Sequence, residues 1–252
     1  NTQALLDAWP QAQRDTERVA IINGLAKTPE DPAGKELILR AAGNHRSKNV
    51  RLTALRALES YDGPEVTRTL IDSLGHSWPQ AREIARSTLE VQGTSAHESL
   101  LTAVRGAESP LVRAGALRVL TSQAVDAPKL SRQVVDLAAR SARSDGTAEV
   151  RDAAADALGR LQANEHRALL SELVQTDESS RVRLAADRAM NELGQEANEQ
   201  EVVVAVLPLD NLIKQSKHDR LGQQVADFVQ ASLSSARVCR VVDRAKVDEV
   251  IK

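Results

Sequence analysis

The sequence predicts a mostly α-helical chain: an α-α superhelix of about six helix pairs, followed by a small, incomplete α/β segment of order β-α-β-α. A repeated pattern, Arg-x-x-(Ala/Ile)-x-x-x-(Leu/Met), predicts the superhelix, and its arginines are separated by 33, 31, 31, 38 and 32 residues. Repetition at this period is typical of a solenoid, in which each unit packs only on its neighbours. A change to strand periodicity after residue 200 predicts the second part. The pattern occurs at Arg18/Ile21/Leu25, Arg51/Ala54/Leu58, Arg82/Ala85/Leu89, Arg113/Ala116/Leu120, Arg151/Ala154/Leu158 and Arg183/Ala186/Met190.

Each repeat is predicted to contain two helices, and the Arg pattern marks the second. Residues three, four and seven apart lie on one helical face, so Arg51, Ala54 and Leu58 form one stripe. The first helix of each pair has an apolar stripe of its own. These stripes are Leu5/Leu6/Trp9, Leu37/Ile38/Ala41, Val66/Leu70/Leu74, Leu100/Leu101/Val104, Val134/Leu137/Ala138 and Leu169/Leu170/Leu173.

Proline and glycine predict where the helices begin and end. Proline is tolerated in a first helical turn, and glycine is common just after a last one. The predicted starts are Asp31-Pro32, Gly63-Pro64, Trp78-Pro79 and Ser109-Pro110, and the predicted ends are Gly43, Gly93 and Gly194. We assign the long step of 38 residues to a looser connection at residues 143–147.

Residues 1–195 are predicted to form the solenoid, 196–200 a linker within the polar stretch 194–200, and 201–252 the α/β segment. The β-branched run Val202–Leu207 indicates a strand buried on both faces. A helix at about 217–235, a strand at 238–242 and a helix at about 245–251 follow. A crossover helix predicts parallel, right-handed strand pairing. Because two strands make a poor sheet, we expect a domain that continues beyond Lys252.

Composition excludes several classes of protein. The chain has 42 % hydrophobic and 27 % charged residues, a net charge of −2 and only 2 % aromatic residues. The sequence has no basic stripe of the kind that indicates nucleic-acid binding. The lone Cys239 permits no intrachain disulfide, and no apolar stretch is long enough to span a membrane. The chain begins at Asn1 without a signal-like region, so we expect a mature or engineered fragment.

The repeats resemble the HEAT family, especially its short bacterial branch with phycobilisome-lyase-like members. The resemblance lies in Glu149–Gly159 (EVRDAAADALG), Asn49–Leu55 (NVRLTAL) and Arg181–Ala186 (RVRLAA), and it covers about residues 1–195. The third repeat departs from the pattern with Ala81 where Val is usual, and the first with Ile21 for Ala.

The tail resembles the start of the domain shared by the curli-secretion channel (CsgG) family, the TolB amino-terminal domain and lipoprotein activators of penicillin-binding proteins. Val206–Asn211 (VLPLDN) matches their opening strand, with Leu209 in place of Phe. Leu221-Gly222 and Val241–Arg244 (VVDR) match later positions. The resemblance covers about 201–252 and implies a bacterial cell-envelope protein, periplasmic or lipid-anchored, that acts through protein contacts. The cytoplasm is the alternative location.

The arginines suggest two kinds of role. We expect the six pattern arginines to be structural, with packed stems and guanidinium groups bound to an acid or carbonyl of the adjoining repeat. A ladder of binding sites is the alternative. Arg56, Arg118 and Arg188, with Arg86 nearby, could form a stripe for an acidic partner on the concave face; a solvated surface is the competing interpretation. Asp156 interrupts this series.

No catalytic or metal site is predicted. The five histidines lack metal-ligand spacing, and no nucleophile elbow occurs. Pro208 and Leu209 stand where a nucleotide-binding strand would lead into a glycine-rich loop. Asp210 and Asn211 are expected to form a turn, with a binding role as the alternative because ligands favour that sheet edge.

The sequence therefore predicts a non-enzymatic scaffold or adaptor for protein partners in a bacterial envelope assembly, without a cofactor. A structural subunit of an oligomeric envelope complex is one alternative, and a bilin-lyase-like enzyme is another. Peripheral membrane association through a lipid anchor outside this segment, and a homo-oligomer formed through the C-terminal segment, are both compatible with the tail's resemblance.

Overall fold

The computed structural model describes residues 2–197, 203–204 and 240–241. The chain divides into two compact units, Asn1–Leu193 and Gly194–Lys252, which are considered separately. Within residues 2–197 the predicted six helix pairs are present. The first helices are α1 (Thr2–Ala8), α3 (Pro32–Asn44), α5 (Pro64–Ser73), α7 (His97–Gly106), α9 (Pro128–Ser144) and α11 (Arg167–Thr176); the second helices are α2 (Asp15–Leu25), α4 (Lys48–Ala57), α6 (Pro79–Gln92), α8 (Pro110–Ala124), α10 (Ala148–Arg160) and α12 (Ser180–Ala197).

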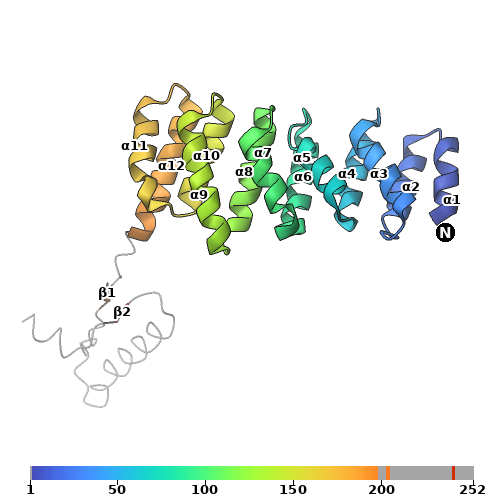
Figure 1. Ribbon diagram of the computed structural model, residues 1–252, viewed down its shortest axis with the longest axis horizontal. Helices are drawn as coiled ribbons and strands as arrows, with labels where there is room; N and C mark the ends of the chain where they lie inside the picture. The colour runs from blue at the N-terminus through green and yellow to red at the C-terminus, as the bar shows by residue number, and fades with distance from the viewer. Residues whose placement is uncertain (1, 198–202, 205–239, 242–252) are drawn as a thin grey trace, which may run out of the picture. The chain divides into compact units, whose positions relative to one another are not determined.

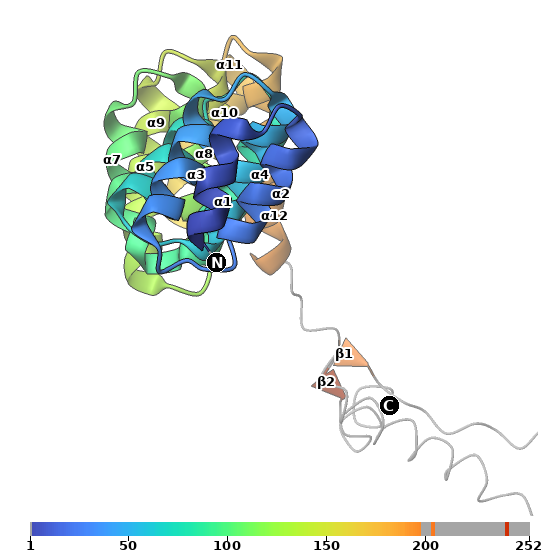
Figure 2. The same ribbon diagram turned by 90° about the vertical axis from the view of Figure 1, so that its right-hand side faces the viewer.

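The helices form two layers in one row, from α1 to α12 (Figure 1). Viewed along the row, α3, α5, α7 and α9 lie in one layer, and α2, α4 and α12 lie in the other (Figure 2). The second helices pack closely on one another from α2 to α10, whereas successive first helices contact one another less. The exposed side of the second-helix layer is called the second-helix face below, and the opposite side is called the first-helix face.

The core lies between the layers and consists of Ala, Leu, Val and Ile with few aromatic residues. The predicted first-helix stripes are buried from the second repeat onward, as at Leu100, Leu101 and Val104, and the motif residues Ala54, Ala116 and Ala154 are fully buried. In the first repeat, Leu5, Leu6 and Trp9 are only partly buried against this core. Alanine at these positions lets neighbouring helices approach closely.

Proline begins the helices as predicted at α3, α5, α6 and α8, and also at α9. Gly93 ends α6 with a positive φ of 59°, as predicted. The predicted ends at Gly43 and Gly194 are wrong, because both residues lie inside helices. α3 continues to Asn44, with His45 as its C-cap, and α12 continues to Ala197.

The long step before the fifth motif arginine has a different origin from the one predicted. α9 has 17 residues, whereas α7 has 10, and it continues to Ser144. The connection to α10 is therefore only residues 145–147, not a loose loop. Buried Ala138, Ala139 and Ala142 extend the apolar face to the end of α9 and make the longer helix stable.

In the second unit the structure describes β1 (Val203–Val204) and β2 (Arg240–Val241), which pair in parallel with Val203 opposite Arg240. These residues fall within the two strands predicted from the sequence. The remainder of the predicted α/β segment lies outside the described residues.

Candidate functional site

Five of the six motif arginines, all except Arg18, donate to a backbone carbonyl at the junction between the two helices of their own pair. Arg82 donates to the carbonyl of His76 at 2.7 Å, Arg113 to that of Ala107 at 2.7 Å, and Arg183 to that of Asp177 at 2.6 Å. Arg51 donates to Gly43 at 2.7 Å. These carbonyls belong to the arginine's own helix pair, whereas the sequence analysis expected carbonyls of the adjoining pair.

Two motif arginines also bind a carboxylate of the next helix pair. Arg113 holds the carboxylate of Asp145 through two hydrogen bonds of 2.9 and 3.0 Å, and Arg151 holds Asp177 through two of 2.7 and 3.0 Å. Such bidentate pairs fix geometry as well as charge. The expectation that the pattern arginines bind an acid of the adjoining repeat is confirmed for these two.

The carboxylates of these pairs are held in their charged form. Hydrogen bonds from Arg151 keep the pKa of Asp177 below its ordinary value, against the opposing effect of burial. Burial alone would raise the pKa of Asp145, but hydrogen bonds from Arg113 and Thr147 outweigh it and lower the pKa. Both pairs are therefore structural links between repeats.

In four repeats, the side chain six residues before the motif arginine binds the backbone N–H that directly precedes the following helix. Asp145 and Asp177 accept from the backbone N–H two residues later, at 3.0 and 2.8 Å. His45 and His76 do the same through Nδ1, at 3.1 and 3.0 Å. Burial and neighbouring arginines lower the pKa of both histidines, so they are neutral acceptors at pH 7. The sequence analysis missed this position, although its spacing from the motif was a usable signal.

The four candidate arginines on second helices differ in what they contact. Arg86 is bound on both sides within α6, by Glu83 and by Glu90 at 2.6 Å. Arg118 binds Asp152 of α10 at 2.9 Å, and its side chain is still 37 % exposed. Arg56 and Arg188 are exposed and form no ion pair with any other described residue. The structure thus brings no continuous row of unbound arginines together.

Asp152 is the centre of an ion-pair network that the sequence analysis did not predict. Its Oδ2 accepts from Arg118 of α8 at 2.9 Å and from Arg181 of α12 at 3.0 Å, and its side chain is only 9 % exposed. One carboxylate therefore joins three successive second helices. Asp152 follows the motif arginine directly, a position that is apolar or acidic in other repeats, so only three-dimensional contacts identify its partners.

Acidic residues interrupt the arginine series near its end, as the sequence indicated at Asp156. Burial raises the pKa of Glu192 in α12, and the charge of Asp156 adds to this effect. This part of the second-helix face therefore combines Arg188 with two carboxylates.

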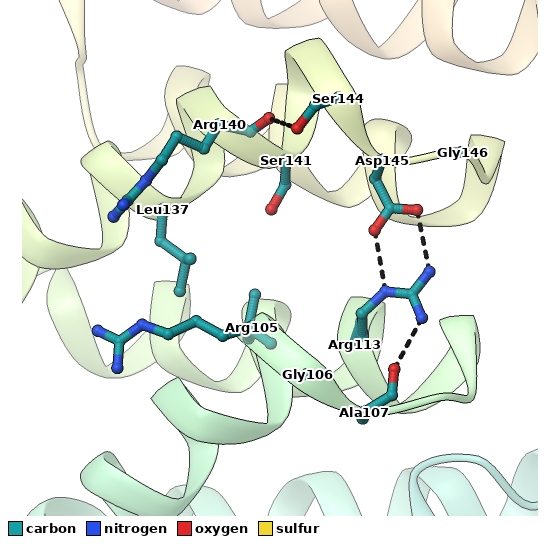
Figure 3. Close-up of a pocket in the computed structure, with 11 residues that line it drawn as sticks. Arg105, Gly106, Ala107, Arg113, Leu137, Arg140, Ser141, Ser144, Asp145 and Gly146 are labelled. Atoms are coloured by element: carbon teal, nitrogen blue, oxygen red, sulfur yellow. Dashed lines mark hydrogen bonds and ion pairs between the residues drawn. The ribbon is translucent and has the colours of Figure 1, made fainter.

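The first-helix face carries grooves between successive helices. A groove of about 490 Å³ lies between α7 and α9, and its lining residues include Arg105, Leu137, Arg140 and Ser141 (Figure 3). The Arg113–Asp145 pair closes one end of it (Figure 3). Similar grooves lie between α5 and α7 and between α9 and α11. The sequence analysis considered only the second helices and missed these grooves.

Within residues 2–197, 203–204 and 240–241, no three His, Cys, Asp or Glu side chains lie close enough together to hold a metal ion. In the same described part of the chain, no helix is both long and apolar enough to cross a bilayer. Asp210, Asn211 and Cys239 lie outside the described residues.

The family model for HEAT repeats matches residues 2–90 and 97–191, which include all six motif arginines. The chain belongs to the HEAT-repeat family. HEAT repeats generally mediate protein–protein interaction, and their solenoid is typically a non-catalytic scaffold. The resemblance of the repeats to the HEAT family is therefore confirmed, and the matched residues do not extend into the tail. No curated protein matches this HEAT-repeat chain.

Solved structures similar to this HEAT-repeat chain include the TOG3 domain of Mini spindles from Drosophila melanogaster. It is 15 % identical, with a TM-score of 0.50, and the match covers 74 % of this chain and 93 % of that one. An engineered protein is also similar, with 17 % identity, a TM-score of 0.41 and coverage of 77 % and 96 %. The likeness to the TOG3 domain is one of fold alone.

Proposed function

We propose that the chain is a non-enzymatic protein-binding scaffold of a bacterial cell-envelope assembly, and that a partner protein docks on the second-helix face. The HEAT-repeat family supports the binding of a protein. The envelope location is supported by the sequence resemblance of residues 201–252 to the curli-secretion channel and TolB amino-terminal families.

The observation that carries the docking face is the placement of three arginines. Asp152 holds Arg118 through one guanidinium nitrogen, so the remaining donors of this group are available to a partner. Arg56 and Arg188 stand exposed on helices of the same layer. A side chain held in place before binding loses less entropy when a partner arrives, which favours Arg118 as an anchor.

The test is a pull-down from bacterial envelope extract with the whole chain as bait. The Arg56→Glu/Arg188→Glu variant reverses two exposed charges and leaves the Asp152 network intact. The matched control, Arg40→Glu/Arg68→Glu, makes the same charge change at exposed positions of α3 and α5 on the first-helix face. We expect the parent and the control to capture the same protein, and the Arg56/Arg188 variant to lose it.

Equal capture by all three proteins would remove the second-helix face from the proposal. Capture from a cytosolic extract alone would contradict the envelope location. Absence of any captured protein from both extracts would contradict the scaffold itself.

A further inference from the structure

The three grooves of the first-helix face differ in charge. Two of them combine cations with carboxylates along their walls. Their charged lining residues are Arg68, Asp72, Glu98 and Glu108 between α5 and α7, and Arg143, Asp145, Arg151, Glu172, Asp177 and Glu178 between α9 and α11. In the α7/α9 groove the only lining carboxylate is that of Asp145, which both Arg113 and Thr147 already bind.

The α7/α9 groove joins an apolar floor to two guanidinium groups. Leu137 and Val104 are buried and line it, and Ser141 lies on its α9 wall. Arg105 from α7 and Arg140 from α9 extend toward the same end of the groove, opposite the Arg113–Asp145 pair (Figure 3). The two walls therefore present cations to the same region.

Neither guanidinium is neutralised within the described part of the chain. Arg140 donates from Nε to the carbonyl of Asp136 in its own helix at 3.2 Å, and this bond leaves both terminal nitrogens available. Arg105 is exposed, and no described carboxylate forms an ion pair with it. A guanidinium has five N–H donors and no acceptor, so these groups are suited to a carboxylate or another planar anion.

Other cations of α9 extend the positive charge of Arg105 and Arg140 along the first-helix face. Within Pro128–Ser144 the cations Lys129, Arg132, Arg140 and Arg143 are all exposed, and Asp136 is the only acid. This excess is unusual in a chain with a net charge of −2. A local basic field raises the association rate of an acidic ligand and selects against basic ones.

We propose that the α7/α9 groove is a second docking site, which binds an acidic segment of a partner protein. A carboxylate of the segment bridges Arg105 and Arg140, and an adjoining aliphatic side chain packs on Leu137. The apolar floor and the position of the groove between two helices favour a peptide, since a bilayer or a nucleic acid would contact the exposed helix surfaces instead. The site does not depend on the second-helix face.

The test measures binding of a fluorescein-labelled decapeptide of alternating Glu and Leu to the whole chain by fluorescence anisotropy. The Arg105→Gln/Arg140→Gln variant removes both guanidinium groups without adding charge. Lys129→Gln/Arg132→Gln is the control, because it removes the same charge from the same helix outside the groove. We expect Arg105→Gln/Arg140→Gln to weaken binding at least about tenfold, as expected for lost charge-assisted hydrogen bonds, and the control to weaken it less than about twofold as a long-range charge effect.

Three competing probes decide what the groove recognises: the matching Gln/Leu peptide, a labelled ten-nucleotide oligo(dT), and phosphatidylglycerol vesicles. Binding of the Gln/Leu peptide with equal strength would remove the carboxylate from the proposal. Stronger binding of oligo(dT) or vesicles, equal loss in the two variants, or no binding of the Glu/Leu peptide would each overturn it. As a control for folding, the thermal unfolding midpoints of both variants are measured and are expected to equal that of the parent.

Discussion

At the scale of single residues, the motif arginines act through the partners that the structure gives them. Arg151 is the most completely bound, with the carboxylates of Asp177 and Glu178 and the carbonyl of Asp145 around it. Its side chain is 10 % exposed and that of Asp177 is 4 % exposed. A buried carboxylate that loses its cation is much less stable than an exposed one, so this pair has a large effect when it is broken.

Replacement of Arg151 by Met is therefore expected to lower the free energy of unfolding by about 3–5 kcal/mol, because Asp177 remains buried without its partner. Arg183→Met is the matched control. Among the described residues, Arg183 donates to the carbonyls of Asp177 and Glu178 and to no carboxylate, so its loss is expected to cost about 1–2 kcal/mol. Urea unfolding followed by circular dichroism measures both, and equal losses would show that the carboxylate pair adds nothing beyond the carbonyl bonds.

At the scale of the helices, the closeness of the second helices depends on small residues at particular points. Gly159 of α10 faces Ala189 of α12, and a Cβ added there would lie 2.7 Å from the Cα of Ala189 and 2.6 Å from an oxygen of Glu192. A backbone atom cannot move aside as a flexible side chain can. The α10–α12 contact therefore requires glycine at this position for space rather than for backbone conformation.

Substitution of Gly159 by Ala tests this contact. We expect a loss of about 1–3 kcal/mol in the free energy of unfolding, since overpacking outweighs the helix propensity of Ala. Gly43→Ala in α3 is the control: nothing lies within 4 Å of an added Cβ, so a gain of up to about 1 kcal/mol is expected. Differential scanning calorimetry measures the stability of both variants. If both substitutions are stabilising, the close approach of α10 and α12 does not require glycine at position 159.

At the scale of the whole solenoid, one recurring position holds different residue types near the two ends of the row. The position six residues before the motif arginine is His45 or His76 in the second and third repeats and Asp145 or Asp177 in the fifth and sixth. In the fourth repeat Ala107 occupies it and supplies no side-chain acceptor. The side chains at this position therefore titrate differently along the row.

This difference predicts two separate steps of acid destabilisation. The folded pKa values of His45 and His76 lie below the ordinary value near 6.5, so the unfolded chain binds more protons below about pH 6.5 and stability falls there. Above about pH 6.5 both histidines are neutral in the folded and the unfolded chain, so they cause no loss of stability there. For Asp145 and Asp177 the folded pKa values are also lowered, so their contribution is lost only below about pH 4.

Hydrogen exchange at pH 7.5 and 5.5, corrected for the intrinsic rate, measures the first step. Exchange in α2–α5 should accelerate at pH 5.5 relative to exchange in α9–α12. The His45→Asn/His76→Asn variant is expected to remove the difference, because Asn offers a similar acceptor that does not titrate. Uniform acceleration along the row would show that protonation of these histidines does not destabilise their repeats.

Periodicity along the chain was sufficient to predict the six helix pairs, their apolar stripes and the structural role of the motif arginines. The helix pairs and their stripes depend on residues three to seven apart on the same helix, so the order of the sequence contains them. The role of the arginines was inferred from their place at the start of these stripes, and their partners were not predicted. The end of α3 was missed because Gly43 can remain inside a helix where nothing requires it to leave.

The charge available to a partner depends instead on residues far apart in the sequence. Arg118 is held by Asp152, 34 residues away, and Asp145 is neutralised by Arg113, 32 residues away. The α7/α9 groove exists only because successive first helices pack less closely than successive second helices. Neither the pairing of these charges nor the space between the helices is encoded in a local pattern, so only the packed structure shows which arginines remain free to bind.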